Sequence, residues 1–183
     1  MRRRTVSAGF TLIELMVVLV VAAVLQSLAA PAVSAMLDSV RVTSAVNSLF
    51  SSFLLARSEA IKRNAHAVVC KSDSGETCAT GGGWEQGWIV FHDVNKNARR
   101  DPGEARLSRQ SALSASIRLT GNGPVASYVS YTPMGNTTYT AGAFQAGTLI
   151  VCAKSANRVE AHQLALNMVG RPRTVKAKLQ RCP

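Results

Sequence analysis

The chain has 183 residues, enough for one modest hydrophobic core rather than several large domains. Hydrophobic residues make up 47% of it and aromatic residues only 5%, so the core should be mostly aliphatic. The formal net charge is +11 and is still +8 without the first nine residues, which favours an anionic partner such as nucleic acid or a lipid surface, unless the charge serves solubility alone.

An apolar run follows three N-terminal arginines and extends from Phe10 to Ala30. Its length is close to the roughly 20 residues that cross a bilayer as a helix, and the arginines mark its cytoplasmic side. A secretory signal peptide would end at a small-residue cleavage site, whereas this run continues into helix-compatible sequence. Glu14 does not fit a plain anchor, because an unpaired carboxylate near the end of such a segment costs up to a few kcal/mol.

The stretch AGFTLIELMVVLVVAAVL resembles the N-terminal signature of type IV pilins and type II secretion pseudopilins. In that family a prepilin peptidase cleaves after the glycine, here Gly9, and the new first residue, here Phe10, is N-methylated. The family glutamate falls on Glu14, which implies a role in assembly. Its carboxylate would meet the Phe10 amine of a neighbouring pilin, and a misaligned subunit would leave both charges unpaired.

This resemblance implies a leader over residues 1–9 and a helix over residues 10–31 that spans the inner membrane once and then forms the filament core. The head would lie in the periplasm and reach the pilus or cell surface after assembly.

Residues 32–64 contain no glycine or proline. Apolar residues recur there at steps of three and four: Val33, Met36, Leu37, Val40, Leu49, Phe53, Ala56 and Ala60. The pattern predicts an amphipathic helix that packs on the head and stops at Asn64.

After Asn64 the chain changes to short segments rich in β-branched and aromatic residues, separated by turn residues. The segments are HAVVC, GWIVFHD, VASYVSY and TLIVCAK, and the alternating RVEAHQLALN follows. The last two should form a hairpin across SAN. We therefore predict an α+β fold in which a long N-terminal helix packs on a mostly antiparallel β head, residues 65–183.

Four cysteines follow the apolar run. The N-terminal arginines place this part of the chain in the periplasm, where disulfides persist. The four cysteines allow three pairings. Cys70 and Cys78 flank the turn-like KSDSGET, which favours Cys70–Cys78 together with Cys152–Cys182, and the second bond would tie the last residues to the sheet. A zinc site would need closer cysteine spacing and more histidine.

The stretch DVNKNARRDPGE offers a weak candidate for a calcium loop. Its oxygen-bearing residues occupy positions 1, 3, 5, 9 and 12 of an EF-hand-like loop: Asp93, Asn95, Asn97, Asp101 and Glu104. Position 6 is Ala98 rather than glycine and two arginines add positive charge, so we favour a polar turn without metal. With the preceding WEQGWIVFH, the stretch is similar to the middle of the GspH/FimT branch of the pilin superfamily.

The C-terminal segment NMVGRPRTVKAKLQRC concentrates positive charge: residues 152–183 hold seven basic residues and one acidic residue. Arg171 precedes a proline and should be extended, so Arg171 and Arg173 would point one way, as would Lys176 and Lys178. The sequence Gly170-Arg171-Pro172-Arg173 resembles the G-R-x-R motif of FimT-like minor pilins, which bind DNA during natural transformation. The resemblance implies DNA contact at Gly170, Arg171 and Arg173, and the concentrated charge extends the predicted DNA-binding edge to Lys176, Lys178 and Arg181, unless that charge is simply solvated or meets an acidic neighbour.

No enzyme or cofactor is predicted. The three histidines lie in separate segments, and neither a nucleophile elbow nor a zinc-protease motif accompanies them. The predicted function is a minor type IV pilin that binds DNA non-specifically and supports DNA uptake, with other pilins, the prepilin peptidase, the inner membrane and DNA as partners. The alternatives are a type II secretion minor pseudopilin acting in protein secretion and a calcium-binding surface module.

Overall fold

The computed structural model describes residues 11–154 and 159–183, so the leader and Phe10 lie outside the described residues. The chain divides into two compact units, residues 1–37 and 38–183. The helix α1 (Leu12–Arg63) begins in the first unit and ends in the second. The side chains at residues 11–20 are all exposed. Within the described residues, no helix combines the length and apolarity needed to cross a membrane.

One face of α1 is buried in the head from Val42 onward. Each buried position has another three or four residues away on the same face: Val42, Ala45, Val46, Leu49, Phe53, Ala56 and Ala60. The predicted buried face of the helix is therefore confirmed from Leu49 onward. It is wrong for Val33, Met36, Leu37 and Val40, which are 48–69% exposed, because the core that covers α1 begins only at Val42.

The helix ends one residue before the predicted stop. Asn64 adopts a φ of 49°, and the amide of Ala65 donates to the carbonyl of Ala60 at 3.1 Å. This is a left-handed C-terminal cap, a position where asparagine is tolerated better than most residues.

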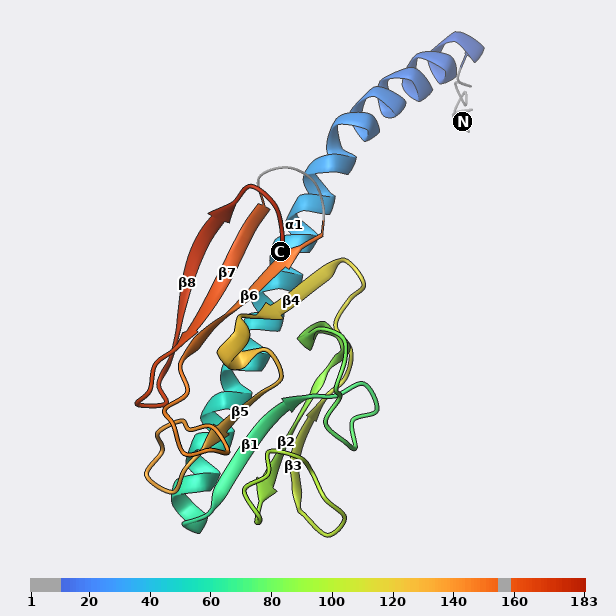
Figure 1. The fold of residues 1–183 in the computed structure, drawn as a ribbon. Helices are drawn as coiled ribbons and strands as arrows, with labels where there is room; N and C mark the ends of the chain where they lie inside the picture. Colours follow the sequence, from blue (N-terminus) through green and yellow to red (C-terminus); the bar gives the residue numbers. More distant parts are fainter. Residues whose placement is uncertain (1–10, 155–158) are drawn as a thin grey trace, which may run out of the picture. The chain divides into compact units, whose positions relative to one another are not determined.

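Two four-stranded antiparallel sheets and α1 form the head (Figure 1). The first sheet has the order β3-β2-β1-β5 and the second the order β4-β6-β7-β8. The strands are β1 (His66–Lys71), β2 (Trp88–Asp93), β3 (Arg106–Gln110), β4 (Ile117–Gly121), β5 (Tyr128–Tyr131), β6 (Gly147–Ala153), β7 (Val159–Leu166) and β8 (Pro172–Leu179). Short 3-10 helices, η1 (Trp84–Gln86) and η2 (Gly123–Val125), lie in the loops. The predicted α+β class is confirmed.

The predicted hairpin of β6 and β7 is confirmed: Gly147 pairs with Leu166 and Cys152 with Ala161. The connecting residues 155–158 lie outside the described part of the chain. Two strands were not predicted. In β3, arginine, serine and glutamine occupy four of five positions, as suits an exposed sheet edge. In β4, the sequence IRLTG has only two apolar residues, so its strand pattern is weak.

Two tryptophans anchor the core between the sheets and α1. Trp84 and Trp88 are fully buried, and the ring of Trp84 meets Phe53 edge-on with centroids 6.5 Å apart. The indole of Trp84 donates to the carbonyl of Val125 at 3.0 Å, and that of Trp88 donates to the hydroxyl of Ser52 at 2.9 Å. Aliphatic residues are more numerous in the core, as predicted, but aromatic rings supply its largest side chains.

Candidate nucleic-acid interface

The first candidate residue along the chain, Glu14, is part of a helix cap. Its carboxylate accepts hydrogen bonds from the amide and hydroxyl of Thr11, at 2.8 and 2.9 Å, and its own amide donates to the Thr11 hydroxyl at 3.3 Å. This reciprocal arrangement is a capping box. Within one subunit, Thr11 is therefore a hydrogen-bond partner of the Glu14 carboxylate. The predicted processing residues Gly9 and Phe10 lie outside the described residues.

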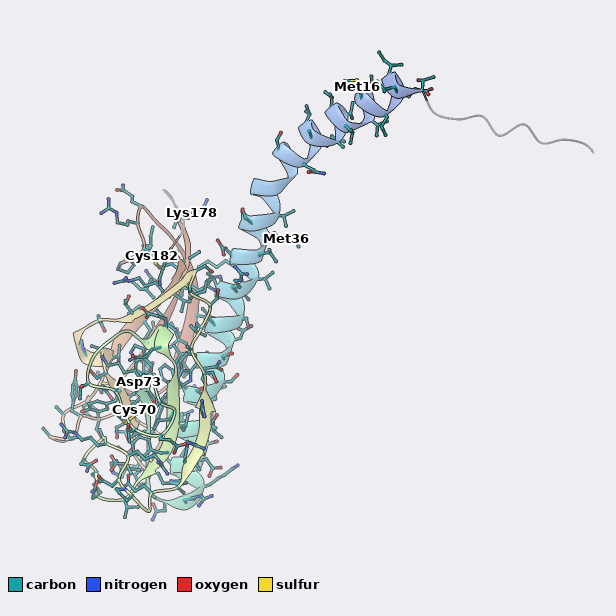
Figure 2. All side chains as sticks on the ribbon, turned by 90° about the vertical axis from the view of Figure 1, so that its right-hand side faces the viewer. Met16, Met36, Cys70, Asp73, Lys178 and Cys182 are labelled. Carbon is teal, nitrogen blue, oxygen red and sulfur yellow. A yellow bond between two sulfur atoms is a disulfide. The ribbon has the colours of Figure 1, made fainter. Side chains whose placement is uncertain are left out.

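The predicted basic segment forms β8, the edge strand of the second sheet (Figure 1). Its basic residues are all exposed: Arg171, Arg173, Lys176, Lys178 and Arg181. Figure 2 shows Lys178 and Cys182 near one end of the head, apart from Cys70 and Asp73. We call these five residues and their strand the basic edge.

The basic edge has two rows of charge, one on each face of the strand. Paired residues on neighbouring strands point to the same face of a sheet. Thr174 pairs with the buried Leu164, so Lys176 and Lys178 belong to the face that carries the core. Arg173 pairs with Ala165 and lies on the opposite face. The rows therefore flank the unpaired backbone of β8 from both sides.

Charge is divided unevenly between the two halves of the head. Residues 38–116 hold ten basic and eight acidic residues, whereas residues 117–183 hold eight basic residues and one acidic residue. In the first half arginine and lysine make salt bridges, such as those of Arg100 and Arg106 with Glu76. Within the described residues, no salt bridge involves the basic edge.

Gly170 places the basic edge against the rest of the head. It has a φ of +76°, and a β-carbon at this position would lie 2.1 Å from the carbonyl oxygen of Gly135. That oxygen also accepts a hydrogen bond from Nε of Arg57 on α1, at 2.9 Å. The next residue is fixed as well, because the amide of Arg171 donates to the side chain of Asn167 at 3.1 Å. Gly170 therefore allows a close approach and contributes no side chain of its own.

The disulfide Cys152–Cys182 holds the chain end against the second sheet, with the two Cα atoms 5.9 Å apart. This is the pairing that the sequence predicts. Arg118 pairs with Cys152 in the strand register, and Arg181 directly precedes Cys182, the other half of the disulfide. Arg118 is exposed but was not predicted as part of this surface, because it lies far from the basic C-terminal segment in sequence. Only the strand pairing could have revealed it.

The other disulfide, Cys70–Cys78, is likewise the predicted pair. It lies beside the loop proposed as a weak calcium candidate. Within the described residues, no cluster of three or more metal-binding side chains is present.

The carboxylates of that loop accept hydrogen bonds from its own backbone. Asp93 accepts the amides of Asn97 and Ala98 at 3.1 and 2.8 Å. Glu104 accepts the amides of Val94 and Asp101 at 2.8 and 3.0 Å. Burial raises the pKa of Asp93, although these amide hydrogen bonds oppose the rise. The loop is thus a turn stabilised by its own carboxylates.

The histidines do not form a site with these residues. His92 is buried, and its Nε2 lies 3.7 Å from Glu59 of α1. His66 lies in the neighbouring strand opposite Asp93, and His162 lies in the other sheet.

Two family models match the chain. Residues 45–170 match the family described as type II transport protein GspH, and residues 4–29 match the prokaryotic N-terminal methylation motif. The GspH match therefore covers most of the head and ends directly before the arginine-rich start of the basic edge.

Individual proteins similar to this chain are also pilins or pilin-like proteins. The chain is 38% identical over 96 residues to the pilin-like protein PilA1 of Thermus thermophilus. The aligned residues make up 52% of this chain and 54% of PilA1. It thus spans about half the length of this curated relative. Two crystal structures of the type IV minor pilin FimU of Pseudomonas aeruginosa superimpose with TM-scores of 0.55 and 0.54 at 15% identity. They cover 78% and 77% of this chain and 95% and 99% of the FimU chains. At this identity the match shows a shared fold.

Proposed function

The chain belongs to the GspH family within the type IV pilin and pseudopilin superfamily, and we propose that it is a minor pilin whose head binds DNA through the basic edge. In this proposal the peptidase cleaves after Gly9, Phe10 is methylated, and Glu14 sets the register between subunits. The subunit starts in the inner membrane with its head in the periplasm and then joins a pilus with other pilins.

The uneven division of charge is the observation that carries the DNA proposal. A net charge of +7 over residues 117–183, against +2 over residues 38–116, gives one half of the head a strong attraction for polyanions. The seven basic side chains of that half that the structure describes are all exposed and make no salt bridge with the described residues, so they are available to phosphates.

The shape of the basic edge suits a phosphate backbone. An edge strand is reachable from both of its faces, so the row with Arg173 and the row with Lys176 and Lys178 can approach one duplex together. Guanidinium groups offer two parallel donors to a phosphate, and lysine adds a compact charge. Contacts of this kind position a protein on DNA but do not read its bases, so binding would be independent of sequence.

A type II secretion pseudopilin is the second candidate, because the family model that matches residues 45–170 is described as a type II transport protein. Its partners would be other tip subunits and secreted protein, and the basic edge would meet an acidic neighbour. A deletion strain separates the two functions. We expect loss of transformation with normal protein secretion, restored by the wild-type chain but not by the Arg171→Gln/Arg173→Gln chain. Lost secretion with normal transformation would support the second candidate.

A further inference from the structure

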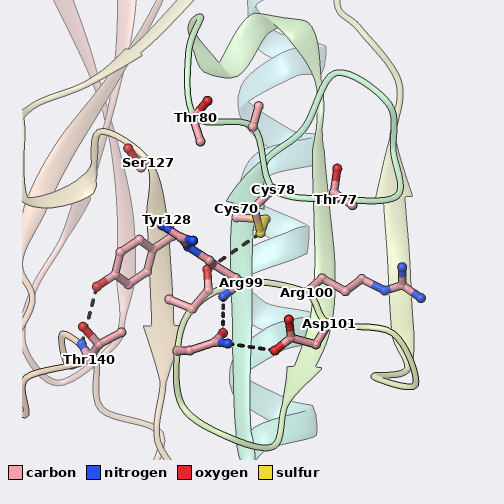
Figure 3. A pocket seen from close by; sticks show the side chains of 13 residues that line it. Cys70, Thr77, Cys78, Thr80, Arg99, Arg100, Asp101, Ser127, Tyr128 and Thr140 are labelled. Atoms are coloured by element: carbon pink, nitrogen blue, oxygen red, sulfur yellow. Dashed lines mark hydrogen bonds between the residues drawn. A yellow bond between two sulfur atoms is a disulfide. The ribbon is translucent and has the colours of Figure 1, made fainter.

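A pocket of about 520 Å³ opens beside the disulfide Cys70–Cys78, on the side of the first sheet (Figure 3). Its volume lies within the range of small-molecule sites, about 300–1,000 Å³. The walls come from the disulfide loop, the loop after β2 and the start of β5. None of the five residues of the basic edge lines it.

The walls of the pocket are held by covalent and hydrogen bonds. The disulfide ties one wall to the buried Cys70 in β1. The side-chain amide of Asn97 donates to Asp101 at 2.7 Å. The hydroxyl of Tyr128 accepts from the amide of Thr140 at 3.4 Å. A ligand would therefore meet a largely preformed site.

The uncharged lining groups suit a ligand with several hydroxyls. Four aliphatic hydroxyl side chains line the pocket: Thr77, Thr80, Ser127 and Thr140. Each can donate one hydrogen bond and accept others, which matches the dual character of a ligand hydroxyl. The ring of Tyr128 adds an aromatic surface against which the C–H face of a sugar ring can pack, and its O–H remains able to donate.

The charged lining groups favour an anion. Arg99 is exposed, and its side chain makes no hydrogen bond or salt bridge with the described residues. The guanidinium of Arg100 is already paired with Glu76, with its carbonyl at 2.9 Å and its carboxylate at 3.5 Å, but Nε of Arg100 is buried with no partner among the described residues. The one lining carboxylate, Asp101, already accepts from Asn95 and Asn97. These two hydrogen bonds and the charge of Arg99 lower the pKa of Asp101, but the Arg99 guanidinium makes no hydrogen bond or salt bridge to that carboxylate and can still bind an acceptor. The buried Nε of Arg100 likewise calls for an acceptor.

We propose that this pocket binds a sugar acid, with the carboxylate on Arg99 and the ring over Tyr128 among the hydroxyl side chains. The assignment is independent of the DNA proposal, because it concerns a different surface and a different ligand. It gives the head a second recognition site for acidic carbohydrate.

Titration of the full-length chain in detergent tests this, with D-glucuronate, D-glucose and acetate as separate probes. Because glucuronate is a small ligand, we expect it to bind with a Kd of about 1 mM. Glucose lacks the carboxylate and acetate lacks the ring, so each should bind at least about tenfold more weakly.

Variants locate the site. Arg99→Gln should weaken glucuronate binding about tenfold, and Thr140→Val should weaken it less, whereas Arg173→Gln on the basic edge should have no effect. Comparable binding of glucose or acetate, unchanged affinity in folded Arg99→Gln protein, or no glucuronate binding at tens of millimolar would each overturn the proposal.

Discussion

The carbonyl oxygen of Gly135 lies so close to Gly170 that a β-carbon there would approach it to 2.1 Å. Two turns that are 35 residues apart in sequence therefore touch through their backbones, next to the first arginine of the basic edge. The obstacle is a backbone atom, which cannot move aside as a side chain would.

Gly170→Ala should destabilise the head by about 2–4 kcal/mol, because it adds a steric clash to a positive φ. Thermal unfolding measures the loss. Gly142→Ala is the matched control: Gly142 has a φ of +87° with open space around it, so only the backbone strain of about 1–2 kcal/mol applies. Equal losses in the two variants would show that the Gly135 contact contributes nothing.

The second disulfide should stabilise the basic edge as well as the fold. Cys152–Cys182 closes a loop of 30 residues, for which chain entropy predicts about 3–4 kcal/mol, against about 2–3 kcal/mol for the separation of 8 in Cys70–Cys78. We expect the Cys152→Ala/Cys182→Ala variant to unfold at a lower temperature and to bind DNA more weakly, since Arg181 is released. The Cys70→Ala/Cys78→Ala variant should lose stability but keep its DNA affinity once folded. The reverse pattern would contradict the proposed role of the chain end.

Stability in acid should depend on Glu76. A hydrogen bond from Arg106 lowers the pKa of this carboxyl, so the folded state favours its ionised form. The stabilisation is present above the unfolded pKa of roughly 4.3 and is lost as the pH falls through the folded pKa. Thermal unfolding of Glu76→Gln and Arg106→Gln between pH 7 and pH 3 should therefore show a smaller loss of melting temperature than the wild type. Asp73→Asn, in the same loop, is the control and should keep the wild-type profile.

Glu14 offers a test of assembly that separates charge from helix capping. Glutamine also serves as the third helical residue of a capping box, so Glu14→Gln should keep the bond to Thr11 and lose only the charge. We expect cleavage after Gly9 and methylation of Phe10 to continue, as mass spectrometry of the mature protein would show, while filament incorporation falls. Normal incorporation of this variant would show that the charge of Glu14 does not set the register between subunits. Gly9→Val should block cleavage itself.

Features that depend on local pattern could be predicted from the sequence. Asn64 marks a helix end because it tolerates a left-handed conformation, and Cys70 and Cys78 lie close enough across a turn to pair. The two rows of charge on β8 could also have been predicted from the sequence. Alternate residues of a strand share a face, so Arg173 and Lys176, three residues apart, lie on opposite faces.

Features that depend on tertiary contact could not be predicted in this way. Gly170 faces Gly135 only because two distant turns meet, and Arg118 joins the basic region only through its pairing with Cys152. The polar strand β3 carries no apolar alternation, because it lies at a sheet edge.

The central claim is that the basic edge binds DNA, and duplex binding across a range of salt concentrations tests it most directly. The head, residues 38–183, contains every residue of the buried core and can be used for this purpose. Wild-type affinity should be on the order of micromolar, the same for unrelated duplexes, and should fall steeply with salt as counterions are released.

Arg171→Gln/Arg173→Gln and Lys176→Gln/Lys178→Gln should each lower affinity and reduce the salt slope by about two phosphate contacts, because the two rows flank one edge. Arg109→Gln on β3 of the other sheet is the control and should leave both unchanged. An unchanged affinity and salt slope in both double variants would contradict the account and leave the secretion pseudopilin as the better assignment.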